Sequence, residues 1–203
     1  MGTFQDWVSQ LDNSIVLIKA NMPLVLEIIA CLYAIHFVNF LLRYRLNIFG
    51  IYPRHLLGLP GIFISPLLHG NFNHLFFNSI PLFILLCFVL IGGVSNFISV
   101  TLTIVVLGGL GTWLFGRKAL HVGASGIIMG YWSYLLLNAY QQGSAIAIAL
   151  GLVCVYYLGS LFLNLFPLEA RSSFEAHIFG FLGGLAANYT TPYLNPILMQ
   201  HGY

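Results

Sequence analysis

Residues 123–140 read GASGIIMGYWSYLLLNAY, a short apolar stretch that opens with glycine, alanine, serine and glycine. A helix rises 1.5 Å per residue and the hydrocarbon core of a bilayer is about 30 Å thick, so about 20 residues are needed to cross it. A helix from Ser125 to Gln141 is shorter than that and must begin below one membrane surface. Non-helical backbone at such a depth has to be buried in protein or line a watery cavity. The residues before Ser125 therefore predict a pocket.

The chain as a whole has the composition of a membrane protein. Of its 203 residues 59% are hydrophobic, and it has only seven Lys and Arg and five Asp and Glu, whereas about a quarter of an ordinary soluble domain is charged. No such charge occurs from His55 to Gly116 or from Ala119 to Leu168. Runs like these would expose far more apolar surface than a soluble monomer tolerates. The seven basic residues form no cluster, which excludes nucleic-acid binding.

Apolar segments divide the chain into a predicted all-α bundle of six spans with two flanking segments. Residues 1–22 place apolar side chains at three- and four-residue steps between polar ones, which predicts an amphipathic helix on the membrane surface. Residues 23–190 form the bundle and residues 191–203 a C-terminal tail. The six spans are expected at 23–42, 75–92, 97–115, 126–140, 145–166 and 174–190. A Pro- and Gly-interrupted stretch, 43–73, is expected to be a loop with short helices.

Ser125 is a candidate nucleophile because of its place at a helix N-terminus. The free backbone N–H groups and the positive end of the helix dipole there favour a developing negative charge, so an oxyanion site would lie beside the hydroxyl. Ionisable and polar groups inside a bilayer are costly and mark functional sites. The alternative is a Gly/Ser helix start that only permits close packing.

Glycines give two of the predicted spans matching faces. Residues 176–184 read AHIFGFLGG, and Gly180 and Gly184 share a helix face with His177. Gly126 and Gly130 form the same step in the span that begins at Ser125. Helices with such faces can approach closely. The two spans are therefore expected to pack on each other.

Close packing would bring His177 within hydrogen-bond reach of the Ser125 hydroxyl, at about 2.6 to 3.2 Å. An apolar surrounding keeps a histidine neutral, so that it can act as a base. Glu175 is two positions from His177 and faces away on a helix, so a dyad without a carboxylate is predicted. The alternative is a packing histidine that bonds a backbone carbonyl.

His74 and Asn78 are four residues apart and share a helix face. Together with the Ser125 backbone N–H, their side chains could hold the oxyanion of a tetrahedral intermediate. They could instead cap the start of the helix. A zinc site is a second alternative, although the chain has no H-E-x-x-H motif and no acidic ligand nearby; its candidate ligands are His69, His74, His121 and His177.

These motifs, in this order along the chain, resemble the rhomboid family of intramembrane serine proteases. The resemblance covers roughly residues 65–187 and the six-span bacterial form of the family. It implies that Ser125 is the nucleophile, that His177 is the general base and that His74 and Asn78 hold the oxyanion. It also implies that His69 lies near the cavity mouth, with Gly123 and Met129 lining the cavity.

The resemblance further implies a multi-pass protein of the bacterial inner membrane that cleaves transmembrane protein substrates and needs no metal or other cofactor. The chain departs from the family at Met129, where a tyrosine usually stacks beneath the histidine. This departure keeps open a catalytically inactive rhomboid-like protein that binds or escorts membrane proteins. A small transporter is a more distant alternative, based on Glu27 and His36 in the first span.

Overall fold

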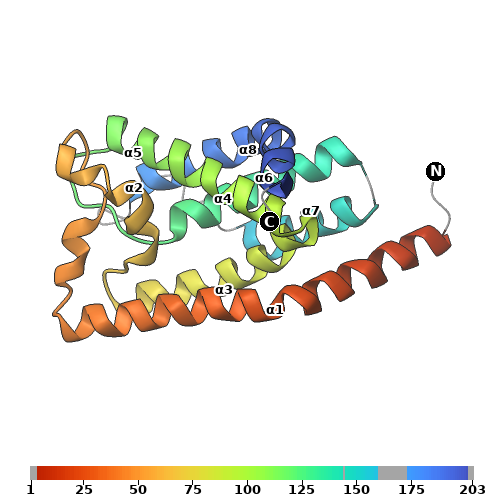
Figure 1. Cartoon of the computed structure of the whole chain (residues 1–203), viewed down its shortest axis with the longest axis horizontal. Helices are drawn as coiled ribbons and strands as arrows, with labels where there is room; N and C mark the ends of the chain where they lie inside the picture. The colour runs from red at the N-terminus through yellow and green to blue at the C-terminus, as the bar shows by residue number, and fades with distance from the viewer. Residues whose placement is uncertain (1–3, 144, 160–172, 201–203) are drawn as a thin grey trace.

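The computed structural model describes residues 4–143, 145–159 and 173–200, and the chain is helical almost throughout these residues. No strand forms in them beyond a single antiparallel bridge between Ile51 and His121. The longer helices are α1 (Phe4–Leu41), α3 (Phe72–Val89), α4 (Val94–Thr103), α5 (Gly109–Phe115), α6 (Ser125–Gln142), α7 (Ala145–Leu158) and α8 (Phe174–Gln200) (Figure 1). These helices lie where the six apolar segments were predicted, although the predicted segment 145–166 is described only to residue 159.

The helices pack in a continuous series around α6 and α8. Helix α1 packs on α3, α3 on α6, α6 on α8, and α8 on α4, and the α6–α8 contact is the most extensive of all. The buried apolar core gathers side chains from α1, α3, α4, α6 and α7, and α8 contributes Ala187 to it. The two helices that carry Ser125 and His177 thus occupy the middle of the bundle.

A π-helical turn at Ile104–Gly108 joins α4 and α5 into one apolar helix. Ile104 packs against two glycines, because a Cβ added to Gly183 would lie 3.2 Å from its Cα and one added to Gly130 would lie 2.5 Å from its side chain. Single π-helical turns insert an extra residue into a helix and often occur at functional sites. Here the turn fits α4 and α5 onto the glycine faces of α6 and α8.

Within the described residues, three helices are long and apolar enough to cross a membrane: Gln5–Leu41, Phe72–Gly92 and Val94–Phe115. A shorter apolar helix covers Ala147–Tyr156. Among the described residues, helices α6 and α8 do not combine the length and the hydropathy of these three spans. Both carry glycines and polar side chains on the faces that pack together. The fold is that of an all-α, multi-pass membrane protein.

Two predicted boundaries fall inside helices. The surface segment 1–22 and the first span are parts of one continuous helix, α1, which passes through Pro23 and, at 1.5 Å per residue, is about 57 Å long. Its N-terminal part extends beyond the other helices (Figure 1). Helix α8 likewise continues to Gln200 through Pro192 and Pro196, where a tail was expected. A proline removes one backbone hydrogen bond from a helix. In apolar surroundings the remaining backbone N–H and C=O groups can be satisfied only by the helix itself, so the helix continues through the proline.

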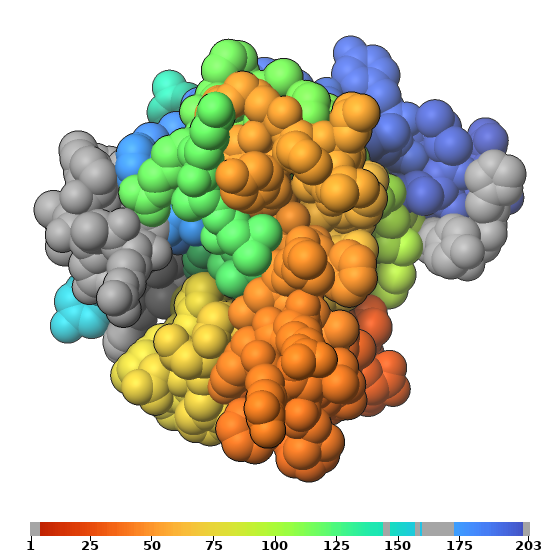
Figure 2. Space-filling model, turned by 90° about the vertical axis from the view of Figure 1, so that its left-hand side faces the viewer, coloured from red at the N-terminus to blue at the C-terminus, as the bar shows by residue number. Residues whose placement is uncertain are grey.

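The predicted loop between the first two spans folds into short helical turns that cover one end of the bundle. This cap segment, residues 43–71, contains two 3-10 turns, at Arg45–Phe49 and Leu56–Gly58, followed by α2 (Gly61–Ile64) and a third turn at Ser65–Leu67. It adjoins the connecting loop, residues 116–124, which leads from α5 to α6; in Figure 2 the two are orange and green. Both segments therefore lie beside the start of α6.

Candidate active site

The side chains of Ser125 and His177 form a hydrogen bond in the middle of the bundle. Ser125 Oγ lies 2.9 Å from His177 Nε2. Ser125 is the first residue of α6, and His177 stands in the first turn of α8. The histidine is buried and the serine is partly exposed. A hydroxyl bonded to an imidazole nitrogen is the pair that nucleophilic catalysis by serine requires.

Glycines allow α6 and α8 to approach closely enough for this contact. A Cβ on Gly180 would lie 2.8 Å from the carbonyl carbon of Gly126, and a Cβ on Gly184 would lie 2.6 Å from that of Gly130. Real Cβ atoms essentially never come so near to backbone, so any larger residue would push the helices apart. The distance between Ser125 and His177 therefore depends on these glycines.

The N-terminus of α6 presents backbone donors next to the Ser125 hydroxyl. Ala124 precedes the helix and caps it with no side-chain hydrogen bond. The Ala124 carbonyl accepts from the N–H of Ile128, at 3.0 Å, so the N–H groups of the first turn have no acceptor within the helix. Such donors, with the helix dipole, form a site for negative charge.

His74 and Asn78 both face the turn that leads into Ser125. A Cβ on Gly123 would lie 2.8 Å from His74 Nε2 and 3.5 Å from Asn78 Nδ2. Asn78 Nδ2 is buried and has no hydrogen-bond partner among the described residues. The helix cap is made by a different residue, because Asn71 Oδ1 accepts from the His74 backbone N–H at 2.8 Å. The side chains of His74 and Asn78 are therefore not used for capping, and their polar atoms face Gly123.

Gly123 adopts a conformation that other residues rarely reach. Its φ is +125°, in the region that favours glycine. Its N–H donates to the Ser65 carbonyl at 2.9 Å, a contact between two main-chain groups that no residue type in the sequence predicts. The cap segment therefore holds the turn in front of α6 directly.

His69 lies beneath the same turn and not at the mouth of a cavity. It is fully buried, and its Nε2 accepts a hydrogen bond from the Ala124 N–H at 3.5 Å. The pKa of His69 is lowered to about 3, chiefly by burial and also by the nearby rings of His74 and His36, while the Leu67 carbonyl opposes the shift. The ring is therefore neutral at pH 7 and carries its proton on Nδ1. His69 belongs to the cap segment, but its ring is turned into the interior of the protein and so does not reach the mouth.

A small cavity of about 40 Å³ lies beside the serine. Gly123, Gly126, Ala176 and Gly180 are among the residues that line it. Met129 does not line it, because one turn along α6 its side chain points into the apolar core and is only 1% exposed. The cavity is large enough for a water molecule.

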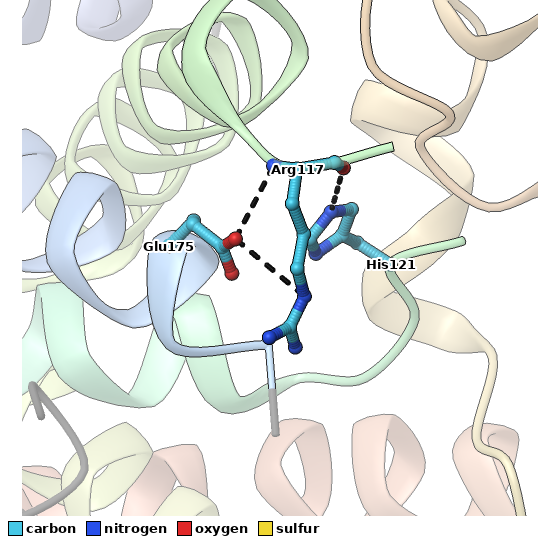
Figure 3. Close-up of polar contacts among 3 residues, drawn as sticks. All are labelled: Arg117, His121 and Glu175. Atoms are coloured by element: carbon cyan, nitrogen blue, oxygen red, sulfur yellow. Dashed lines mark hydrogen bonds and ion pairs between the residues drawn. The ribbon is translucent and has the colours of Figure 1, made fainter. Parts of the chain in front are cut away.

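The histidines do not group as metal ligands. In the described part of the chain no three His, Cys, Asp or Glu side chains come together as a metal site. His121 bonds the Arg117 carbonyl through Nε2 at 3.2 Å, as Figure 3 shows. Burial lowers the pKa of His121, and the Arg117 carbonyl and Glu175 oppose that shift in part. The zinc alternative therefore has no set of ligands here.

Glu27 and His36, the basis of the transporter alternative, do not form a polar path. Glu27 is exposed on α1, whereas His36 is buried among the rings of Tyr44 and Phe72. Two such different surroundings on one helix provide no continuous route for a solute.

Fold and site together define a helical membrane protein with a serine–histidine pair at the contact of two glycine-faced helices. A family model described as "Rhomboid domain" matches residues 57–193. The chain therefore belongs to the rhomboid family.

Relatives of known sequence occur in mycobacteria. The chain is 35% identical over 174 residues to "Uncharacterized protein Rv1337" of Mycobacterium tuberculosis, covering 81% of this chain and 72% of that protein. It is 32% identical over 176 residues to "Uncharacterized protein ML1171" of Mycobacterium leprae, covering 81% and 69%. No solved structure matches the chain.

Proposed function

We propose that this protein is an intramembrane serine endopeptidase that cleaves transmembrane segments of membrane proteins through Ser125 and His177. The observation that carries the proposal is the 2.9 Å hydrogen bond between Ser125 Oγ and His177 Nε2. Membership of the rhomboid family supports the same activity. The proposal includes six membrane spans, with α6, α7 and α8 added to the three that are long and apolar enough, and a place in the bacterial inner membrane.

The mechanism follows from the atoms around Ser125. His177 Nε2 accepts the proton of Ser125 Oγ as that oxygen attacks the carbonyl carbon of the scissile peptide bond. The tetrahedral intermediate collapses when the same nitrogen returns the proton to the leaving amine, and an acyl-enzyme remains. A water molecule then attacks the ester carbonyl and gives its proton to His177; the bond from the acyl carbon to Ser125 Oγ breaks, the proton returns to Oγ, and the carboxylic acid product leaves. The cavity of about 40 Å³ beside Gly123 and Gly126 is a place from which that water can come.

The negative charge on the substrate oxygen needs donors in fixed positions. The Ser125 backbone N–H, His74 Nε2 and Asn78 Nδ2 are the proposed donors, supported by the approach of both side chains to Gly123. The buried Nδ2 of Asn78, which has no partner among the described residues, is costly in the resting protein. Its cost is offset if the group bonds the oxyanion, where one such donor contributes about 3 kcal/mol.

A rhomboid-like protein that binds or escorts membrane proteins without cutting them is the second candidate. Met129, at the place of the family tyrosine, is the observation that favours it. A thioether still contacts aromatic rings, but it holds an imidazole less firmly than a stacked ring does. The intact hydrogen bond between Ser125 and His177 argues for the protease.

The test compares the wild-type protein with Ser125→Ala and Ser79→Ala in detergent. Ser79 is a matched control, because it is a buried serine whose hydroxyl bonds the Leu75 carbonyl of its own helix. We expect wild type and Ser79→Ala to cleave single-span substrates and to react with a fluorophosphonate probe, and Ser125→Ala to do neither while it stays folded. Cleavage by Ser125→Ala would exclude Ser125 as nucleophile. Substrate binding by a wild type that neither cuts nor labels would favour the escort.

A further inference from the structure

The connecting loop in front of Ser125 is held to the cap segment by backbone hydrogen bonds. His121 exchanges two such bonds with Ile51, at 2.9 and 3.0 Å, and the Gly123 N–H donates to the Ser65 carbonyl at 2.9 Å. These contacts fix Ser125 relative to the cap segment. They do not fix it relative to α8, the helix that carries His177.

A contact at the other end of the connecting loop reaches α8. Glu175 Oε1 accepts a hydrogen bond from the Arg117 backbone N–H at 3.2 Å and forms an ion pair with Arg117 Nε at 3.6 Å (Figure 3). The guanidinium of Arg117 also lies 5.5 Å from the centre of the Phe174 ring. Two consecutive residues in the first turn of α8 thus hold the start of the loop, and His177 is two residues further on.

We infer that Glu175 is a positioning residue whose carboxylate ties the connecting loop to the first turn of α8 and so sets the distance between Ser125 and His177. The inference rests on the proposed function, because it concerns the same pair of side chains. An error of about 1 Å in the position of a reacting group can cost 10²-fold in rate. A tie between the segments that carry the two groups therefore has a direct effect on catalysis.

The bond to the backbone N–H is the more important of the two contacts. The Arg117 side chain is 38% exposed, whereas that of Glu175 is 9% exposed. A half-exposed ion pair contributes little, but a buried carboxylate that accepts a backbone N–H makes a charge-assisted hydrogen bond. The Arg117 guanidinium then serves mainly to offset the buried negative charge.

Glu175 is a costly residue to keep at this position. Its second oxygen, Oε2, is buried and has no hydrogen-bond partner among the described residues. A buried carboxylate is unfavourable unless it is paired. Glu175 could also have a simpler role, because an acidic residue in the first turn of a helix interacts favourably with the helix dipole. That role is open to any carboxylate in the first turn and requires neither burial nor a hydrogen bond to the loop. The contact with Arg117 is therefore the feature that distinguishes Glu175.

The experiment compares Glu175→Ala, Glu175→Gln and Ser99→Ala in full-length protein. Glutamine keeps an oxygen that can accept the Arg117 N–H but loses the charge. Ser99→Ala is the matched control, since it removes a hydrogen bond that joins α4 to the far end of α8, from Ser99 Oγ to Asn195 Oδ1. The measurements are kcat and KM on a single-span substrate, the rate of fluorophosphonate labelling of Ser125, and hydrogen exchange of the connecting loop.

We expect Glu175→Ala to lower kcat and the labelling rate by roughly 10- to 100-fold with little change in KM. The same variant should speed hydrogen exchange in the connecting loop, while Glu175→Gln and Ser99→Ala stay near wild type in every measurement. The inference is wrong if Glu175→Ala keeps wild-type kcat and exchange, or if Glu175→Gln falls as far as Glu175→Ala. A wild type that neither cuts nor labels refutes the proposed function instead, and loop exchange still reports whether Glu175 ties the loop.

Discussion

The two halves of the serine–histidine pair are held in position by different kinds of interaction. On the Ser125 side, the N–H groups of Gly123 and Ala124 donate to the Ser65 carbonyl and to His69 Nε2, both in the cap segment. On the His177 side, Gly180 and Gly184 let α8 lie directly against the backbone of α6. Directed hydrogen bonds position the serine, whereas close contact of two backbones positions the histidine.

This difference determines which substitutions damage each half. A hydrogen bond is lost when its acceptor is removed, even if the new side chain has the same volume. A backbone contact is lost when volume is added, whatever the polarity of the new side chain. Substitutions that remove a hydrogen-bonding group should therefore disturb the position of Ser125. Substitutions that add a methyl group should disturb the position of His177.

Gly180→Ala should have the largest effect, because it acts on the contact between α6 and α8. The added Cβ would overlap the Gly126 carbonyl group. We expect the free energy of unfolding to fall by about 1–3 kcal/mol, as for other overpacked sites, and cleavage to fall by more than about 10²-fold as His177 moves away. Thermal melting in detergent and a cleavage assay measure the two effects.

Gly159→Ala is the matched control for that variant. A Cβ at Gly159 would meet no atom of the described residues within 4 Å, so this variant should melt and cleave like wild type. If Gly180→Ala also cleaves at the wild-type rate, the close contact of the helices does not set the position of His177.

Removal of a proposed oxyanion donor should have the next largest effect. His74→Ala and Asn78→Ala should each lower kcat by about 10²-fold, a typical loss for one such donor. Asn71→Ala separates this role from helix capping, because Asn71 accepts the His74 backbone N–H at the start of α3. It should lower stability by about 1 kcal/mol and leave kcat nearly unchanged. Equal kcat losses in all three variants would show that the start of α3, and not the oxyanion, is what matters.

The sequence predicted the central contact because glycine spacing carries information about helix packing. Steps of four residues at Gly126 and Gly130, and at Gly180 and Gly184, predict two faces that can meet. The positions of the long helices followed in the same way from apolar length. These features depend on side-chain size and polarity, which are written in the sequence.

The parts that the sequence did not predict depend on the backbone or on distant partners. The bond from Gly123 N–H to the Ser65 carbonyl joins two main-chain groups, and neither residue type marks it. Arg117 and Glu175 are 58 residues apart and both are ordinary surface types by composition. Continuation of α1 through Pro23 also went unpredicted, because proline usually ends a helix and only the tertiary surroundings allow it to continue.

His69 allows a smaller test on the serine side. His69→Leu removes the acceptor of the Ala124 N–H and leaves that buried donor unpaired, which costs about 1–3 kcal/mol. Only part of this free-energy cost acts on the position of Ser125, and the rest lowers the stability of the fold. We therefore expect cleavage to fall by about tenfold. His69→Gln places an amide oxygen in the same region and should recover most of the rate. A leucine variant as active as the glutamine variant would mean that the hydrogen bond does not position the turn.

The smallest expected effect on cleavage at neutral pH comes from the titration of His69 and His121, which makes stability depend on pH only at lower pH. Burial lowers the pKa of both rings, to about 3 for His69, from an ordinary value of 6.5. In the unfolded chain these histidines take up protons as the pH falls below about 6.5, but in the folded protein they do not. Stability is therefore fully present above that pH and declines as the pH falls below it, down to about 3 in the case of His69, by at most about 1.4 kcal/mol per pH unit for each ring.

Melting temperatures between pH 7.5 and 4.5 measure this dependence, and His69→Gln should make it shallower because one of the two rings is gone. The pH dependence that remains in His69→Gln comes from His121 and the other histidines, whose titration the substitution does not alter. Equal slopes in the wild type and His69→Gln would mean that His69 takes up its proton without unfolding. The cap segment would then have to open at low pH to give water access to the ring, and the hydrogen bonds that hold Ser125 in place would be lost before the α6–α8 contact.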